Sequence, residues 1–184
     1  MEKIVEKIED YNLFNYLLPG IIFSYALKYY LGIDVFQTNA IEMIFIYYFI
    51  GSVISRIGSV FIEKILIKIK YIEYAPYDEY LDASKKDNRI SKMVLDNNMY
   101  RTILAGTITL LILKIIQNIP NYLINLHDFA VIALIVFLIL LYLKSFKKQT
   151  KYIYDRVKKC EKWNLRFKGH VKMINAADKR NNRI

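Results

Sequence analysis

Residues 41–67 read IEMIFIYYFIGSVISRIGSVFIEKILI, a stretch in which Arg56 is the one charged side chain between Glu42 and Glu63. A membrane-spanning helix needs about 20 mostly apolar residues, because it crosses about 30 Å of hydrocarbon. Core helices of soluble proteins rarely run this far with so little charge, so a soluble all-α bundle is the less favoured interpretation. The stretch predicts an all-α integral membrane protein.

Three more apolar segments accompany this one, at residues 13–32, 102–119 and 129–143. Segment 129–143 is almost purely apolar, whereas the other two need tilt or neighbouring helices to cross a bilayer. We therefore predict a bundle of about four transmembrane helices within residues 13–143. In the first segment, Pro19-Gly20 predicts an early break, because proline cannot make the helical backbone hydrogen bond. The break is either a hinge or, as the favoured interpretation, a bend that fits the helix around its neighbours.

Basic residues gather on one side of the predicted membrane. Residues 64–101 hold eight of them and residues 144–184 hold 14, whereas the connections 33–40 and 120–127 hold none. Cytoplasmic segments carry the excess of Lys and Arg in membrane proteins. Both termini are therefore predicted to face the cytoplasm, with residues 1–12 as an amphipathic cytoplasmic N-terminus.

Two lysines, Lys28 and Lys114, lie toward the outer ends of their apolar segments. A lysine in this position can extend its ammonium group toward the outer surface. Alternatively, it can pair with one of the acidic residues nearby, which are Asp34, Glu42 and Asp128.

Small and polar side chains repeat every three or four residues along 51–63, so they share one side of a helix. We predict that they form a pore lining or a subunit interface, in which Glu63 pairs with an arginine of a neighbouring subunit. In the alternative, Arg56 extends to the inner membrane surface, and Ser59 and Glu63 already lie among the headgroups. The predicted set is Gly51, Ser52, Ser55, Arg56, Ser59 and Glu63.

The predicted cytoplasmic loop, residues 68–100, divides at Pro76. Proline followed by acidic residues is typical of a helix start, and we expect a short helix over about 77–85. A second helix from about Arg89 is expected to join the third apolar segment. The acids Asp78, Glu79 and Asp82 are explained by the helix dipole rather than by a metal site.

The cytoplasmic tail, residues 144–184, carries 14 of the 27 basic residues and three of the 17 acidic ones. We expect the fourth apolar segment to continue into it as an amphipathic helix with interleaved aromatic side chains. Three roles are open: anchoring on anionic lipid, binding of a nucleotide or single-stranded nucleic acid, and binding of a partner protein. The candidate ligand residues are Lys147, Lys151, Tyr154, Lys158, Lys162, Trp163 and Arg166.

Residue types that carry catalysis are sparse. The single cysteine, Cys160, excludes a disulfide within the chain, and the two histidines leave little from which to build a zinc site. No pattern indicates a nucleophile, a general base, a metal site or a cofactor. The sequence therefore predicts a protein that is not an enzyme, with no catalytic residues and no cofactor.

Four strings carry a resemblance: NLFNYLLPG (12–20), ISRIGSVFIE (54–63), YAPYDEYLDASKKD (74–87) and NNMYR (97–101). They resemble small four-pass bacterial membrane proteins of the kind found as membrane effectors in anti-phage defence operons. The nearest named family is the Hailong membrane effector, followed by the membrane component of the Kiwa system. The resemblance implies a bacterial inner-membrane location and a channel-like oligomer. It also implies control by single-stranded DNA made by a partner nucleotidyltransferase.

Four thin helices leave no room for an aqueous path within one chain, so a homo-oligomer with closed cyclic symmetry is expected. The preferred hypothesis is an ion channel or pore-forming effector that a nucleotide or nucleic-acid ligand controls from the cytoplasm. Its opening would depolarise the membrane and stop growth, as in abortive infection. The second hypothesis is a non-conducting membrane sensor or scaffold, whose basic tail recruits a soluble effector protein.

Overall fold

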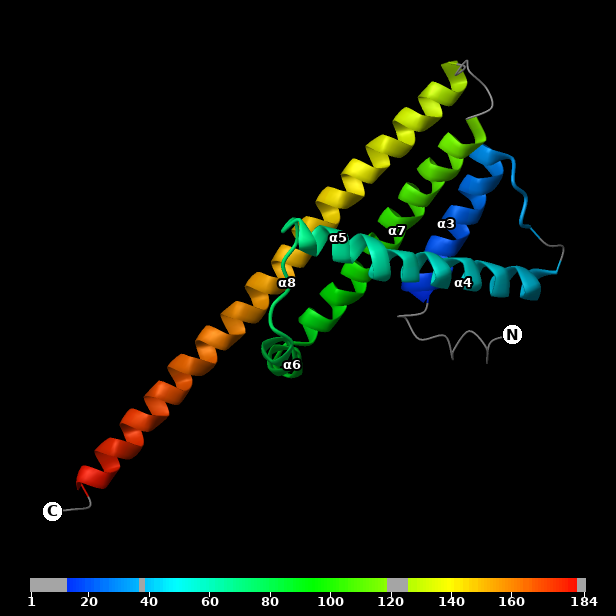
Figure 1. Ribbon diagram of the computed structural model, residues 1–184. Helices are drawn as coiled ribbons and strands as arrows, with labels where there is room; N and C mark the ends of the chain where they lie inside the picture. Colours follow the sequence, from blue (N-terminus) through cyan, green and yellow to red (C-terminus); the bar gives the residue numbers. More distant parts are fainter. Residues whose placement is uncertain (1–12, 37–38, 119–125, 182–184) are drawn as a thin grey trace.

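The computed structural model describes residues 13–36, 39–118 and 126–181, with side-chain positions as far as Trp163. Every regular element in these ranges is a helix (Figure 1), which confirms the predicted all-α class. Among the described residues, three helices are long and apolar enough to cross a membrane. They are Ala40–Lys68, Asn88–Asn118 and Asp128–Trp163. The predicted N-terminal segment, residues 1–12, lies outside the described part of the chain.

The first apolar segment is helical without interruption. A π-helical turn, η1 (Leu13–Leu17), leads into α3 (Leu18–Ala26), and a second π-helical turn, η2 (Leu27–Leu31), follows. The helix therefore continues through Pro19-Gly20 instead of breaking there, and the bend stays a prediction. Pro19 lies in the first turn of α3, directly after the wider π turn, and the changed hydrogen-bond pattern of that turn accommodates a residue that has no N–H.

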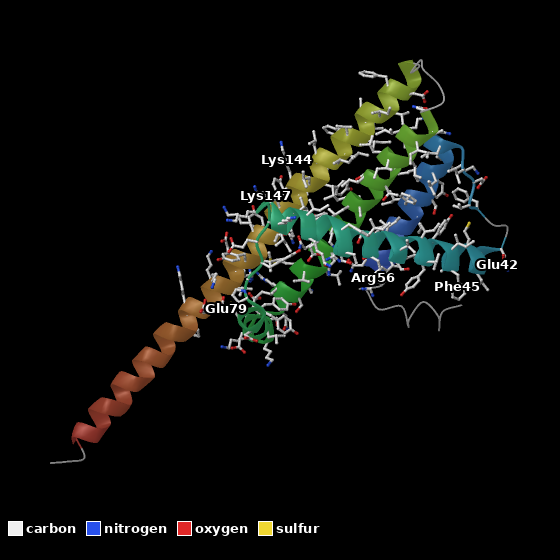
Figure 2. The ribbon with its side chains drawn as sticks, in the orientation of Figure 1. Glu42, Phe45, Arg56, Glu79, Lys144 and Lys147 are labelled. Carbon is white, nitrogen blue, oxygen red and sulfur yellow. The ribbon has the colours of Figure 1, made fainter. Side chains whose placement is uncertain are left out.

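The next helix is formed by α4 (Ala40–Ile57), the π-helical turn η3 (Gly58–Ile62) and α5 (Glu63–Lys68), which follow one another directly. We call this Ala40–Lys68 unit the crossing helix. Figure 1 shows that it lies across α3 and α7 instead of alongside them. Its starting end, where Figure 2 labels Glu42 and Phe45, projects past α3, and Phe45 is 71% exposed.

Two glycines allow the crossing helix to approach the first segment. A Cβ atom on Gly20 would lie 1.9 Å from the Tyr47 carbonyl oxygen, and one on Gly51 would lie 1.8 Å from the Tyr16 carbonyl oxygen. The two helix backbones are therefore in direct contact at this crossing. Small residues have this role in membrane helix packing, where close approach replaces the hydrophobic driving force.

The helices α7 (Asn88–Asn118) and α8 (Leu126–Asn181) run antiparallel as a long pair (Figure 1). Both predicted continuities are confirmed, since α7 begins within the segment predicted to be cytoplasmic and α8 runs unbroken into the basic tail. A main core joins these helices to α3 and the crossing helix. Its buried members include Phe23, Ile54, Leu104, Ile135 and Phe146.

A second, smaller core lies at the basic end of the molecule. The helix α6 (Tyr77–Lys86) begins directly after Pro76, as predicted. Its Ala83 packs with Ile90 of α7 and with Ile153 and Val157 of α8. The segment 68–100 is therefore largely helical and docked on α8, instead of an open loop.

Lysines join the helix ends that the sequence predicts to be the outer ends. Lys28 pairs with Asp34 at 3.0 Å, and Lys114 pairs with Asp128 at 2.8 Å, so pairing with these two acids is confirmed. The Lys114 ammonium group also donates to the Tyr30 carbonyl oxygen at 3.1 Å. Lys114 thereby connects η2, α7 and the start of α8, and its side chain is only 7% exposed.

Candidate functional site

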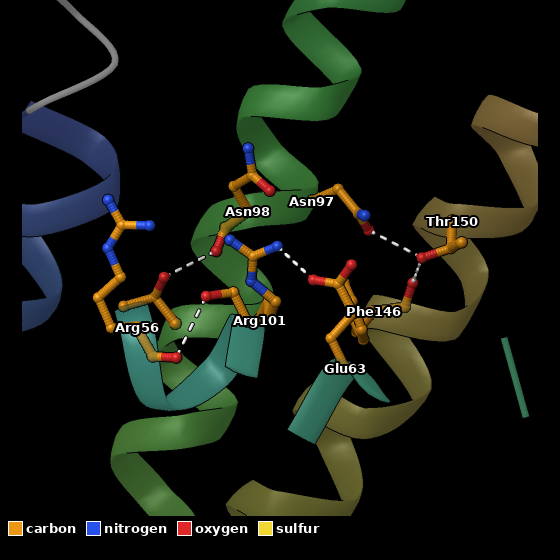
Figure 3. A network of polar contacts seen from close by, with 9 residues as sticks. Arg56, Glu63, Asn97, Asn98, Arg101, Phe146 and Thr150 are labelled. Carbon is orange, nitrogen blue, oxygen red and sulfur yellow. Dashed lines mark hydrogen bonds and ion pairs between the residues drawn. The ribbon is translucent and has the colours of Figure 1, made fainter. Parts of the chain in front are cut away.

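A cluster of polar side chains lies between the two cores, where the crossing helix, α7 and α8 meet (Figure 3). We call it the inner polar cluster, and its members are Glu63, Tyr74, Asn97, Arg101 and Thr150. Arg101 donates to the Glu63 carboxylate. The Thr150 hydroxyl group lies 3.1 Å from the Asn97 side-chain oxygen and 2.8 Å from the Phe146 carbonyl oxygen. These contacts connect the crossing helix, α7 and α8 where the three helices meet.

The ion pair within this cluster corrects the expected partner of Glu63. Glu63 pairs with Arg101 of its own chain, and not with an arginine of a neighbouring subunit. The reason is the π-helical turn η3, which takes up about one residue more than an α turn and so rotates the following residues around the helix axis. This rotation carries Glu63 away from the side that holds Arg56 and toward α7.

Tyr74, in the turn before α6, completes the inner polar cluster. Burial of its hydroxyl group raises the pKa of the Tyr74 phenol, and the nearby Glu63 carboxylate adds to this effect. The protonated hydroxyl group therefore remains available as a hydrogen-bond donor to Glu63. A cavity of about 400 Å³ adjoins the cluster. It is lined by Glu63, Tyr74, Ala75, Tyr77, Tyr80, Val94, Asn97, Asn98, Arg101 and Ile153.

The six residues predicted to line a pore or an interface do not share one surface. Gly51 and Ser55 are buried against neighbouring helices of the same chain, and Glu63 faces Arg101. Ser52 and Ser59 are half-buried, and their hydroxyl groups donate to backbone carbonyls of their own helix at 2.8 and 3.1 Å.

Arg56 is the exposed member of this predicted set. Figure 3 shows its guanidinium group directed away from the Arg101–Glu63 pair. Within the described part of the chain it has no ion-pair partner. It lines a groove of about 450 Å³ beside η1, together with Tyr16, Tyr48, Ser52, Val53, Ile57, Val60 and Phe61. Arg56 is thus the member of the set that is placed to meet something outside its own chain.

The predicted ligand residues of α8 separate into several environments. Lys158 is paired with Glu79 of α6 at 2.7 Å, and Figure 2 shows Glu79 on the side of α6 nearest α8. The Lys147 ammonium group lies over the Tyr71 ring, 4.1 Å from its centre. Lys147, Lys151 and Tyr154 share a groove of about 250 Å³. These residues therefore do not form one site.

The remaining candidates lie further along α8. The Lys162 side chain is exposed, and Trp163 is 69% exposed in a different groove from Lys147 and Lys151. The side chain of Arg166 lies outside the described positions.

The acids of α6 also have a second role that the helix dipole does not explain, since Glu79 binds Lys158.

The groove that contains Trp163 has a volume of about 1010 Å³, and sequence analysis missed most of its residues. Four of its side chains, from Tyr152, Arg156, Lys159 and Trp163, follow one another on α8 at steps of four, three and four. That spacing could have been found in the sequence. The other lining residues are Lys86, Asp87, Met93, Asp155 and Cys160.

An ion pair closes one side of this groove. Arg156 donates to the Asp87 carboxylate, which holds the pKa of Asp87 below its usual value. Asp87 also accepts the Arg89 backbone N–H at 3.1 Å, at the corner between α6 and α7. The pair thus fixes this corner against α8.

No group of three His, Cys, Asp or Glu side chains that could hold a metal ion occurs in the described ranges. Comparisons of the chain with protein-family models, with curated proteins and with solved structures found no match. The resemblance to defence effectors accordingly stays a prediction, and function has to be argued from the geometry of these surfaces.

Proposed function

We propose that this chain is the subunit of a homo-oligomeric channel or pore-forming effector of the bacterial inner membrane, with both termini in the cytoplasm. A nucleotide or single-stranded nucleic acid on the cytoplasmic face controls its opening, and opening depolarises the membrane. In this proposal, residues 13–31 form the fourth membrane-spanning segment. Its biological setting is anti-phage defence, with a nucleotidyltransferase as a possible partner enzyme.

The observation that carries this proposal is the continuity of α8. One unbroken helix contains both the apolar segment 129–143 and the basic segment that follows it. A ligand held at the basic end therefore acts on the same rigid element that lies in the membrane. The inner polar cluster connects α8 to the crossing helix through the contacts of Thr150 with Asn97 and of Arg101 with Glu63.

The exposed position of Arg56 supports an oligomer. A charged side chain near the bilayer centre costs at least about 2.5–3.5 kcal/mol unless protein or water surrounds it. A neighbouring subunit or a water-filled path beside the Arg56 groove removes this cost. In a path of this kind, the guanidinium group favours anions.

Reconstitution into liposomes tests this function. We expect the purified protein to conduct ions, and we expect a nucleotide or single-stranded oligonucleotide on the cytoplasmic face to change the flux. A ligand that raises the flux binds the open state more tightly, and a ligand that lowers the flux binds the closed state more tightly. The measurement is ion flux with and without ligand, against empty liposomes. Absence of flux under every ligand condition contradicts the proposal.

Arg56→Ala is expected to lower anion flux by about tenfold, which corresponds to a loss of about 1.4 kcal/mol, or to dissociate the oligomer. Flux and native mass spectrometry of the detergent-released protein measure the two effects. Lys64→Ala removes an exposed charge from the same helix and serves as the matched control. If the Arg56→Ala protein assembles and conducts like the Lys64→Ala protein, then Arg56 lies neither in the pore nor in the subunit interface.

A second function, a non-conducting sensor or scaffold, is favoured by one observation. Figure 1 shows that α8 continues well past α6, as far as Asn181, and so extends away from the rest of the molecule. An isolated basic helix of this length can bind an acidic surface on a soluble effector protein. Lack of flux, together with loss of effector recruitment on truncation after Trp163, would support this alternative.

A further inference from the structure

The groove around Trp163 combines positive charge with exposed aromatic rings. Arg156 and Lys159 contribute two cationic groups from α8, and Lys86 contributes a third from the end of α6. Two acids, Asp87 and Asp155, also line the groove, and Asp87 and Arg156 neutralise each other, so three cations against two acids leave one net positive charge. The groove therefore keeps a net attraction for anions.

Aromatic surface lies at both ends of this row on α8. Tyr152 is 49% exposed and Trp163 is 69% exposed. An exposed indole ring offers a flat face on which a base of any sequence can stack. The cationic groups between the two rings are placed for the phosphate groups of the same ligand. The volume of about 1010 Å³ is sufficient for one or two nucleotide units.

We propose that this groove, on the α6 side of α8, is the binding site for a nucleoside phosphate. The ligand is either a free nucleotide or one unit of a single strand. The inference rests on the proposed ligand control and moves the ligand away from the face that carries Lys147 and Lys151. Lys159 and Arg156 bind the phosphate group, and Trp163 stacks on the base.

The site also suggests how the ligand acts on the fold. A phosphate group that binds Arg156 competes with the Asp87 carboxylate, since both anions use the same guanidinium group. Asp87 ends α6, where its N–H donates to the Ala83 carbonyl oxygen at 2.9 Å, and its own carbonyl oxygen accepts from Ile90 at 3.0 Å. Release of Asp87 therefore loosens the corner between α6 and α7.

The composition of the chain makes a direct test possible. Trp163 is the single tryptophan and Cys160 is the single cysteine, and both line the groove. Full-length protein in nanodiscs is titrated with mononucleotides, with a single-stranded DNA oligomer and with inorganic phosphate. We expect saturable quenching of tryptophan fluorescence and protection of Cys160 from maleimide labelling. The DNA and mononucleotide arms distinguish the two sources of the ligand.

Two variants locate the site. Lys159→Ala is expected to weaken binding by about tenfold, because it removes a charge-assisted hydrogen bond to the phosphate group. Lys151→Ala removes another exposed lysine of α8, which lines the neighbouring groove instead of this one, and is expected to leave binding unchanged. Size-exclusion profiles and circular dichroism confirm that both variants fold.

Three other outcomes contradict the groove assignment. Weakening by Lys151→Ala but not by Lys159→Ala places the ligand in the neighbouring groove of Lys147 and Lys151. If inorganic phosphate quenches the Trp163 fluorescence as much as a nucleotide does, then the base does not stack on Trp163. Nucleotide-dependent ion flux without any change at Trp163 or Cys160 supports the channel function and contradicts this binding site.

The converse result separates the two proposals. Nucleotide binding at the groove without ion flux supports this binding site and contradicts the channel function.

Discussion

Gly51→Val is expected to prevent formation of the native helix crossing and to lower the free energy of unfolding by about 3–5 kcal/mol. A Cβ atom at this position would lie 1.8 Å from the Tyr16 carbonyl oxygen, a separation that no real Cβ contact reaches. The obstacle is backbone, so no side-chain rotation relieves it. The first segment and the crossing helix have to move apart, which opens the contact between Gly20 and Tyr47 as well.

Thermal unfolding in mild detergent, followed by circular dichroism, measures this effect, and a decrease in apparent Tm of about 10 °C is expected. Gly106→Ala is the matched control, since Gly106 is also a glycine within a helix of the main core. A Cβ atom there would lie 3.4 Å from the Phe23 ring, which is an ordinary contact. Because alanine favours helix more than glycine, this control is expected to be neutral or stabilising. Equal losses in both variants would show that the crossing does not depend on backbone contact.

Lys114→Met is expected to destabilise the predicted outer end of the bundle by about 3–5 kcal/mol, because it removes the buried ammonium group that pairs with the partly buried Asp128 carboxylate. The Lys114 side chain is 7% exposed and that of Asp128 is 22% exposed. The change also removes the donor to the Tyr30 carbonyl oxygen at the end of η2. Both consequences loosen η2 and α8 from α7.

Lys28→Met provides the comparison for this prediction. Lys28 forms the same kind of pair with Asp34, but the two side chains are 46% and 54% exposed. Exposed pairs contribute about 0–1 kcal/mol, so this variant is expected to unfold close to the wild-type temperature. Apparent Tm values of the two variants under identical conditions check the difference. If Lys28→Met costs as much as Lys114→Met, then burial of the Lys114 pair is not what stabilises the outer end.

Much of the fold follows from local patterns. The apolar lengths of 41–67 and 129–143 predict helices long enough for a membrane, and Pro76 with its following acids predicts the start of α6 at Tyr77. The alternation of apolar and basic residues after 144 predicts the continuation of α8, with Ile153 and Val157 on its buried side. Each of these properties depends on neighbours within a few turns of one helix, and those neighbours are visible in the sequence.

Less of the candidate site could be predicted from the sequence, because the site depends on contacts between residues far apart in the chain. Glu63 and Arg101 are 38 positions apart, and Arg156 and Asp87 are 69 apart. Helical spacing correctly placed the lysines of α8 on its surface. It did not show that α6 would bind Lys158 through Glu79, or that the ring of Tyr71 would lie under Lys147.

Hydropathy and charge were therefore enough to assign helical class, capacity to cross a membrane and the basic end of α8, since these are sums over neighbouring residues. Two other features came only from the packed chain. The π-helical turn η3 rotates Glu63 away from Arg56, and the meeting of Gly20 with Gly51 sets where the crossing helix passes the first segment. Both arise because helix register and crossing geometry are settled when several helices pack at once, and no single segment contains that information.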